Sequence, residues 1–201
     1  MLNIIKYDNF KSIGKNYNKK QIILTHTSTK LENYLTGLKY RFNKSYSKIP
    51  NYIVDTDGRV IHLLENEDYS EFFQNSEINQ NSIIISLENL GWLNKEPLNN
   101  HYVNWIGDIY KGKVFERKWR ERFFWHPYTT YQIESLAKLC NLIFENTKIE
   151  KNVLGHNTKI NGIEKFKGVV TRSNFYNYFT DVNPSFDFEL FIKKIEDEQF
   201  T

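Results

Sequence analysis

The stretch Gln21-Ile22-Ile23-Leu24-Thr25-His26 is a short apolar run bounded by polar residues. Such a run predicts a buried β-strand, and this one carries a histidine at its C-terminal end. In α/β sheets, sites usually form beyond the carboxyl ends of the strands. His26 is therefore the first candidate site residue, although a lone histidine at a strand end is more often an ordinary hydrogen-bonded side chain.

The bulk composition limits the class of protein. The chain has 201 residues, of which 40% are hydrophobic, 16% aromatic and 25% charged. A chain of this length and composition fits one folded globular domain, and no apolar run approaches the about 18 residues of a membrane span. The formal net charge of +3 is too mild to imply nucleic acid as a partner.

The single cysteine and the first residues bear on metal chemistry and targeting. One cysteine, Cys140, excludes both an intramolecular disulfide and a four-cysteine zinc site, so any metal must be held by His, Asp or Glu. Cys140 falls on the apolar stripe of a predicted helix, which favours a small buried hydrophobe over a nucleophile. The stretch Met1-Leu2-Asn3-Ile4-Ile5-Lys6-Tyr7-Asp8 carries charges where a secretory signal needs an apolar core, so we expect no export signal.

Strand and helix patterns alternate along the chain. Capping boxes at Thr29 with Glu32 and at Thr129 with Gln132 open two segments whose apolar residues recur at helical spacing. The alternation favours an α/β fold, a single domain over 1–201 with a central mixed β-sheet flanked by helices. The predicted strands are 21–26, a hairpin over 52–64, 82–88 and 152–156; the predicted helices are about 29–43, 130–146 and 187–198; the predicted loops are 65–81 and about 157–180.

The segment of about 91–127 is rich in both aromatic and basic residues and has poor periodicity, which indicates an elaborated insertion with short strands. Its rings favour a local core, with a fringe of rings and cations that can contact a ligand. Rings alternating with cations are also typical of grooves for single-stranded nucleic acid. The mild net charge argues against that second reading.

Three candidate metal ligands follow predicted elements. His26 and His156 each end a predicted strand, and Asp181 precedes the Asn183-Pro184 pair late in the chain. Two imidazoles, a carboxylate and one open position form a catalytic type of zinc site, in which the metal lowers the pKa of its bound water to about 7. Zn²⁺ is therefore the cofactor that this set favours.

The sequence resembles the type 2 N-acetylmuramoyl-L-alanine amidases, the zinc family that includes phage endolysins and animal peptidoglycan recognition proteins. The resemblance covers most of the chain, and its motifs come in the family's order. They are Ile22-Ile23-Leu24-Thr25-His26-Thr27-Ser28, residues 51–60, Tyr128-Thr129 with Gln132, Val153-Leu154-Gly155-His156, and Asp181-Val182-Asn183-Pro184-Ser185-Phe186-Asp187.

The resemblance implies a reaction and roles for the residues that match. His26, His156 and Asp181 would bind zinc, and the substrate would be the amide between N-acetylmuramic acid and L-alanine in peptidoglycan. A carboxylate would carry the proton, and Glu88 is the candidate, although the family usually has its glutamate at the position of Ser86. Positions 86 and 88 share one face of a strand, so Glu88 either reaches the same cavity or is a structural carboxylate. Tyr52, His126 and Arg172 are the candidate substrate contacts.

Two further departures from the family pattern leave alternatives open. Many members carry a lysine two residues before the third ligand, where this chain has Phe179, and 25 positions separate His156 from Asp181. A cation from this interval can replace that lysine. Asp187 is the rival third ligand, but a carboxylate at a helix start is also favoured by the helix dipole. The candidate cations are Lys159, Lys165, Lys167 and Arg172.

Two functions remain in view. The first is a zinc amidohydrolase that degrades the cell wall, made in the cytoplasm and acting at the wall as a phage or prophage endolysin, or recycling wall fragments in the cytoplasm. The alternative is a non-catalytic peptidoglycan-binding recognition domain, motivated by Ser86 and Phe179 where catalysis usually has charged groups. Neither reading expects nucleic acid or membrane insertion.

Overall fold

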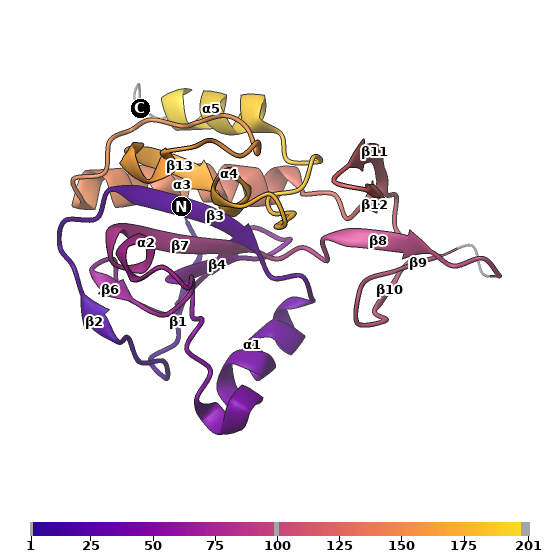
Figure 1. Cartoon of the computed structure of the whole chain (residues 1–201), viewed down its shortest axis with the longest axis horizontal. Coiled ribbons are helices and arrows are strands. Elements are labelled where there is room, and N and C mark those ends of the chain that lie inside the picture. Colours follow the sequence, from indigo (N-terminus) through magenta and orange to yellow (C-terminus); the bar gives the residue numbers. More distant parts are fainter. Residues whose placement is uncertain (1, 99–100, 198–201) are drawn as a thin grey trace.

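A six-stranded mixed sheet forms the centre of the protein in a computed structural model, which describes residues 2–98 and 101–197 (Figure 1). The β4–β5 pair is antiparallel and the other four pairs are parallel. This architecture confirms the predicted α/β class with a central mixed sheet. The strands, in spatial order, are β1 (Ile4–Lys6), β5 (Val60–His62), β4 (Tyr52–Val54), β7 (Ser82–Leu87), β3 (Gln21–His26) and β13 (Gly168–Thr171).

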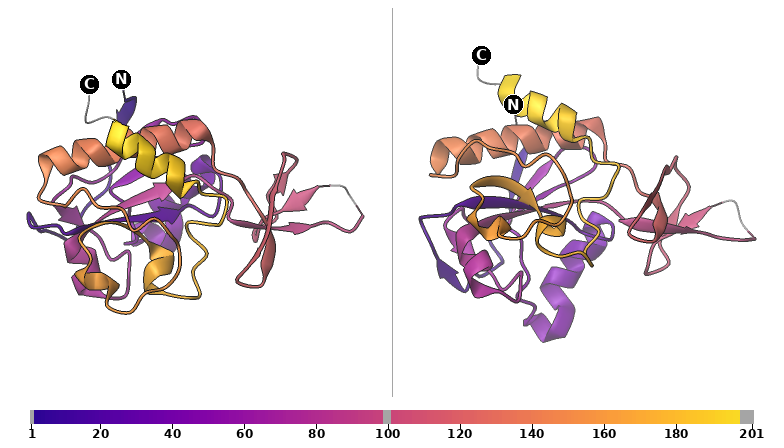
Figure 2. Two further views of the ribbon diagram at one scale, coloured as in Figure 1. Left: turned by 90° about the horizontal axis from the view of Figure 1, so that it is seen from above. Right: turned by 45° about the horizontal axis from the view of Figure 1, so that its top comes forward.

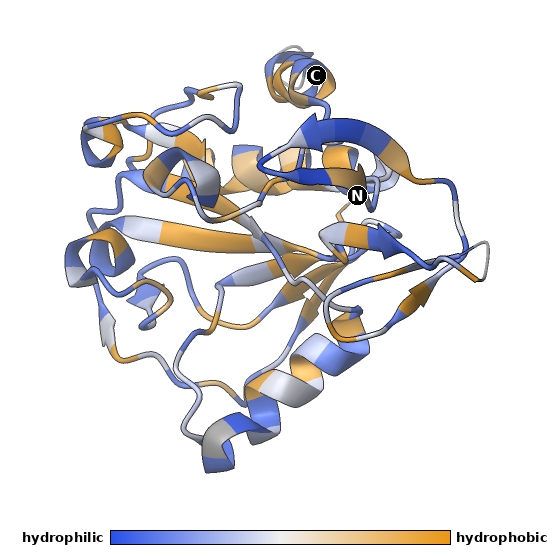
Figure 3. Ribbon diagram, turned by 45° about the vertical axis from the view of Figure 1, so that its right-hand side comes forward, coloured by the Kyte–Doolittle hydropathy of each residue, from blue (hydrophilic) through white to orange (hydrophobic). Residues whose placement is uncertain are grey.

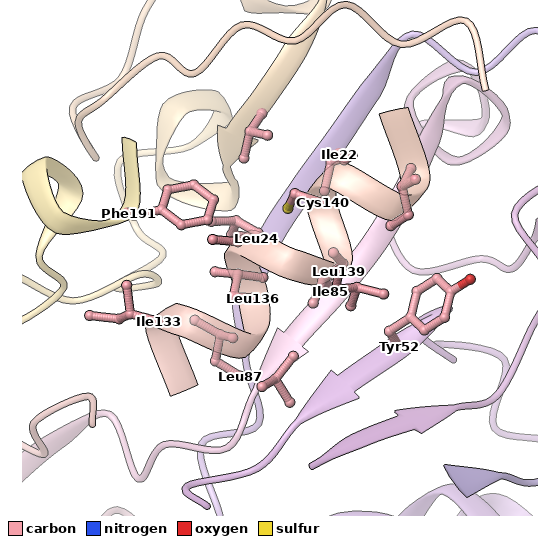
Figure 4. Packing of buried hydrophobic residues seen from close by; sticks show 14 of the residues in the cluster. Ile22, Leu24, Tyr52, Ile85, Leu87, Ile133, Leu136, Leu139, Cys140 and Phe191 are labelled. Carbon is pink, nitrogen blue, oxygen red and sulfur yellow. The ribbon is translucent and has the colours of Figure 1, made fainter. Parts of the chain in front are cut away.

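Two helices cover one face of this sheet, α3 (Thr130–Asn146) and α5 (Phe188–Asp197) (Figures 1 and 4). Side chains alternate along a strand, so Ile22 and Leu24 point to these helices while Ile23 points away. Cys140 of α3 is fully buried in this layer, as the helical pattern predicted, and burial raises the pKa of its thiol.

Shorter elements cover the opposite face, where Ile23, Ile84 and Val170 pack against Phe73 and Phe175. In Figure 3 the central strands are mostly hydrophobic, whereas the helices carry both colours. Burial on both faces explains why the apolar runs of β3 and β7 are continuous. The covering elements are α1 (Leu31–Tyr40), η1 (Arg41–Lys44), α2 (Ser76–Asn81), η2 (Ile163–Lys165) and α4 (Arg172–Phe175).

A second, five-stranded sheet extends from the carboxyl end of β7 and projects from the body (Figures 1 and 2). We call the described residues between 92 and 125 the arm. Trp125 is fully buried at its base, so part of the aromatic content forms a local core. The strands are antiparallel, in the order β10 (Ile109–Tyr110), β9 (Tyr102–Val103), β8 (Trp92–Lys95), β12 (Arg122–Trp125) and β11 (Phe115–Trp119).

Three segments differ from the sequence prediction. The interval 157–180, predicted to be a loop, contains η2, β13 and α4, and the interval 65–81 contains β6 (Asp68–Tyr69), which pairs with β2 (Gly14–Lys15), and α2. The predicted strand 152–156 is reduced to a bridge between Val153 and Val169. These elements have two to six residues and depend on neighbours far along the chain, so local periodicity does not reveal them.

Helix α3 has the predicted bounds, and Thr129 accepts a hydrogen bond from the Gln132 N–H at 3.1 Å as its N-cap. Helix α1 starts at Leu31, two residues later than predicted, and its N-cap residue Lys30 makes no side-chain cap. The last predicted residue of the closing helix, 198, lies outside the described residues. Over the described ranges, every helix is too short or too polar to cross a bilayer.

Candidate functional site

His26 lies at the carboxyl edge of the sheet, 6% exposed and packed against Gly91. A Cβ at residue 91 would lie 3.0 Å from His26 Cε1, so the close approach of the backbone to the imidazole favours glycine at this position.

 The φ of Gly91, +77°, is a backbone conformation that L side chains rarely adopt. Burial lowers the pKa of His26 to about 4; nearby Asp181 opposes this shift and Arg172 adds to it. The imidazole is therefore neutral at neutral pH, and its buried Nδ1 has no hydrogen-bond partner in the described part of the chain.

Asp181 is fully buried beside His26 and forms an ion pair with Arg172. Arg172 Nε lies 2.9 Å from Asp181 Oδ1 and 2.7 Å from Oδ2. The backbone N–H of His26 also donates to Oδ2, at 3.3 Å. The structure thus brings His26, Arg172 and Asp181 together, and of the four cations considered for the position of the family's lysine, Arg172 is the one in contact with this carboxylate.

A cavity of about 180 Å³ opens over His26 and Arg172. We call it the His26 cavity. It combines positive charge with aromatic surface at the carboxyl edge of the sheet, a combination that suits an anionic ligand with flat or ring-shaped apolar parts. The cations are Arg41, Lys48 and Arg172; the rings are Tyr34, Tyr46, Phe72 and Trp105; Thr27, Ser28 and Thr29 complete the wall.

His156 lines a different cavity, of about 370 Å³, which we call the His156 cavity. Its Nδ1 accepts a hydrogen bond from the Thr158 N–H at 3.2 Å, and Arg117 and Trp119 of β11 face the same space. The Asn174 side chain holds the backbone there by donating to the His156 carbonyl at 2.9 Å. Two of the three expected ligands therefore meet, and the third lies in another cavity.

The donor set does not fit a zinc ion in this arrangement. Within residues 2–98 and 101–197, no group of three or more His, Cys, Asp or Glu side chains is placed to hold a metal. Arg172 contacts both carboxylate oxygens of Asp181, and His156 is turned to its own cavity. Asp187, the alternative third ligand, instead caps a helix: its Oδ1 accepts the Leu190 N–H at 2.9 Å near the start of α5.

Glu88, the candidate proton carrier, is bound to backbone groups. Its Oε1 accepts the N–H of Leu31, the first residue of α1, at 2.8 Å, and its Oε2 accepts the Thr56 N–H at 3.3 Å. It lines a third cavity of about 240 Å³ rather than the His26 cavity. Ser86 is fully buried, with its Oγ 2.7 Å from Thr25 Oγ1. Glu88 therefore supplies the cap that Lys30 does not.

The three candidate substrate contacts have different surroundings. Arg172 lines the His26 cavity, whereas His126 lines the cavity of Glu88. Burial, and then the neighbouring His26, lowers the pKa of His126 to about 4. Tyr52 is 7% exposed; its hydroxyl donates to Asn66 Oδ1 at 2.8 Å, so it is committed to the core.

The arm contributes a side chain that sequence patterns did not single out. Trp105, in the turn between β9 and β10, lines the His26 cavity, and its Nε1 donates to the Ser28 carbonyl at 3.0 Å. Arg120, in the turn between β11 and β12, donates to the carbonyls of Ser173 at 3.3 Å and Tyr176 at 3.2 Å. A turn at 104–107 is readable from Asn and Gly, but its contact with residue 28 is not.

These features define an α/β protein whose candidate site is a histidine and a carboxylate at the carboxyl edge of a mixed sheet. The family comparison narrows this class, because residues 15–167 match the model described as N-acetylmuramoyl-L-alanine amidase. The match covers well over half of the chain, which therefore belongs to this family, as its motifs predicted. The matched range includes His26, Glu88 and His156 and ends before Arg172 and Asp181.

Solved structures share the fold at low sequence identity. The chain is 16% identical to the E. coli amidase AmiD, which was solved with anhydro-N-acetylmuramic acid-L-Ala-D-gamma-Glu-L-Lys; the TM-score is 0.54, and the match covers 92% of this chain and 60% of that one. For the amidase LysC of Clostridium intestinale the identity is 12%, the TM-score 0.54 and the coverage 98% and 99%. At these identities the likeness shows the fold alone. No match is found among curated proteins.

Proposed function

We propose that this protein binds the muramyl-peptide unit of peptidoglycan in the His26 cavity. One observation carries the proposal: in a member of the amidase family, three cations and four rings line a cavity at the carboxyl edge of the sheet. A muramyl peptide offers carboxylates for the cations and a sugar ring for the aromatic faces. AmiD, which shares the fold, was solved with a ligand of this chemical class.

Three contacts in the arrangement described favour recognition without cleavage as the first candidate. Glu88 is held by two backbone N–H groups, Ser86 is buried, and Arg172 contacts both oxygens of the Asp181 carboxylate. In the arrangement described, these contacts occupy the candidate proton carrier and one candidate metal ligand of the hydrolytic function. A cationic, aromatic cavity can still bind a muramyl peptide without either group.

Family membership favours a second candidate, hydrolysis of the amide between N-acetylmuramic acid and L-alanine. In this proposal His26, His156 and Asp181 hold Zn²⁺ in an arrangement different from the one described, and the protein is a bacteriolytic, endolysin-like enzyme of phage or prophage origin. Its place of action would be the bacterial cell wall after synthesis in the cytoplasm, or the cytoplasm itself if it recycles wall fragments.

Calorimetric titration with muramyl dipeptide, paired with a cleavage assay on the same peptide, separates these candidates. We expect saturable binding that Lys48→Gln weakens by up to about fivefold, because an exposed cation of the cavity is lost. Lys20→Gln is the matched control, since Lys20 is an exposed lysine at the amino end of β3.

Cleavage is read from new L-alanine amino groups, with and without added Zn²⁺. Binding without amino-group release supports recognition. Release that needs Zn²⁺ and is lost in His156→Ala supports the amidase. Neither binding nor release, under conditions where the protein is folded, would remove both candidates.

A further inference from the structure

The Asp181 carboxylate is fully buried, and the charge opposite it comes from this chain. Arg172 Nε approaches Oδ1 at 2.9 Å and Oδ2 at 2.7 Å, so neither oxygen is remote from the guanidinium. The His26 N–H adds a third contact at 3.3 Å. A carboxylate out of water needs a counter-charge and hydrogen bonds, and this one has both without any added ion.

Aromatic rings hold Arg172 in this position. Its guanidinium lies 3.9 Å from the ring centroid of Phe179 and 5.8 Å from that of Phe72. The face of an aromatic ring attracts a cation and shields it from water. Phe179 stands two residues before Asp181, so the position that carries lysine in the resembling family here carries a ring that supports an arginine from α4.

We infer that the Arg172 guanidinium is the resident cation of Asp181 and excludes a metal ion from this carboxylate until it leaves. A divalent ion bound at Asp181 would stand within a few ångströms of a fixed positive charge in a mostly buried site, where screening by water is weak. The chain would then fold and remain stable without zinc. This inference does not depend on which ligand the His26 cavity binds.

Thermal unfolding with EDTA or with Zn²⁺ tests it, because a metal that binds the folded state raises the midpoint. We expect the wild-type midpoint to be the same in both conditions. Arg172→Met leaves a buried carboxylate unpaired and should lower the midpoint by roughly 6–20 °C. Saturating Zn²⁺ should then restore at least about 5 °C, because His26 Nδ1 and the freed carboxylate become available.

Two variants control the zinc effect. In Arg172→Met with Asp181→Asn, zinc should restore nothing, since the carboxylate is gone. Arg59→Met breaks another ion pair to a buried aspartate, Asp55, which keeps the backbone N–H groups of Asp57 and Arg59 as partners. This variant should lose stability without any recovery in zinc.

Two results overturn the inference. One is stabilisation of the wild type by zinc that Asp181→Asn abolishes, which would show that metal and guanidinium coexist. The other is an Arg172→Met protein with no zinc-dependent gain. If Arg172→Met does not fold, Arg172→Lys replaces it. The lysine ammonium lacks the planar fork of the guanidinium, so its ion pair with Asp181 should be weaker and zinc should raise the midpoint by a smaller amount. No zinc-dependent gain in that variant would overturn the inference in the same way.

Discussion

Burial sets the charge of two neighbouring histidines, His26 and His126. Both have a pKa lowered to about 4, mainly by loss of hydration, and the buried Nδ1 atoms of both have no hydrogen-bond partner in the described part of the chain. Each ring is therefore neutral in the folded protein near neutral pH, whereas in the unfolded chain it takes up a proton near its ordinary pKa of about 6.5.

The stability of the protein should fall as the pH drops from about 6.5 to about 4. In this window the unfolded state binds more protons than the folded state, so the free energy of unfolding decreases as the pH falls, by at most about 3 kcal/mol for one such histidine. Urea unfolding at pH 7, 6 and 5 measures the slope, which His126→Gln should reduce. A slope for His126→Gln equal to that of the wild type would refute the assignment.

Glu88 should matter for stability through α1. Glu88→Ala removes the acceptor of the Leu31 and Thr56 N–H groups and should cost about 1–3 kcal/mol, while Glu88→Gln keeps one oxygen and should cost about 1 kcal/mol or less. Glu32→Ala, in the first turn of the same helix, is the control and should change stability by less than about 1 kcal/mol. Urea unfolding would contradict this role if Glu88→Ala were as stable as the wild type.

The residue-level contacts explain where sequence reasoning succeeded and where it stopped. His26 was found because a run of branched apolar residues marks its strand, whereas Arg172 was named as a candidate substrate contact and as one of four cations in an interval, without its partner. The contact of Arg172 with Asp181 depends on how α4 and the following turn bring residues nine positions apart together. The role of Glu88 depends on a partner 57 positions away, so a correct strand prediction did not predict its contacts.

At the scale of elements, strand β13 shows why a short edge strand escapes prediction. It has four residues, Gly168–Thr171, and pairs in parallel with β3, which lies far away in the sequence. Gly168 has a φ of +128°, and a Cβ there would clash with the Asn152 carbonyl oxygen. In the sequence, Gly168 suggests a loop. In the structure, glycine is required at this position because the backbone of another segment approaches the strand closely. Helix α3, by contrast, has 17 residues, and its apolar residues recur at helical spacing within the helix itself. It was therefore predicted with the correct bounds.

Two glycine-to-alanine substitutions should change stability in opposite directions. Gly168→Ala should destabilise the protein by about 2 kcal/mol or more, because the conformation and the backbone contact both exclude a Cβ. Gly37→Ala, inside α1, should stabilise it by about 0.5–1 kcal/mol, because its Cβ would meet only the flexible end of Arg41 at 3.4 Å. Denaturant titration checks both, and a neutral Gly168→Ala would contradict the proposed close approach.

At the scale of the whole molecule, the arm and the body form the candidate site together. Two contacts fasten the arm, Trp105 to Ser28 and Arg120 to the α4 segment. Directly after the arm, the His126 carbonyl accepts from Asn89 and Asn183 at 3.0 Å each. Trp105 lines the same cavity as His26, and Ser173, which Arg120 contacts, donates to the Asp181 carbonyl. The arm therefore completes the wall of the His26 cavity, although its own strands pair only with one another.

Trp105 should contribute to ligand binding in proportion to the aromatic surface that it adds to the cavity. Its side chain is 55% exposed, so Trp105→Ala should change global stability little but weaken muramyl dipeptide binding about tenfold, through loss of a stacking face of about 1–2 kcal/mol. Phe123→Ala is the matched control, because Phe123 is 53% exposed on the same arm and does not line the cavity. Calorimetric titration of both variants checks the prediction. Equal affinities for Trp105→Ala and Phe123→Ala would mean that the arm takes no part in binding, and the ligand would then have to lie on the body alone.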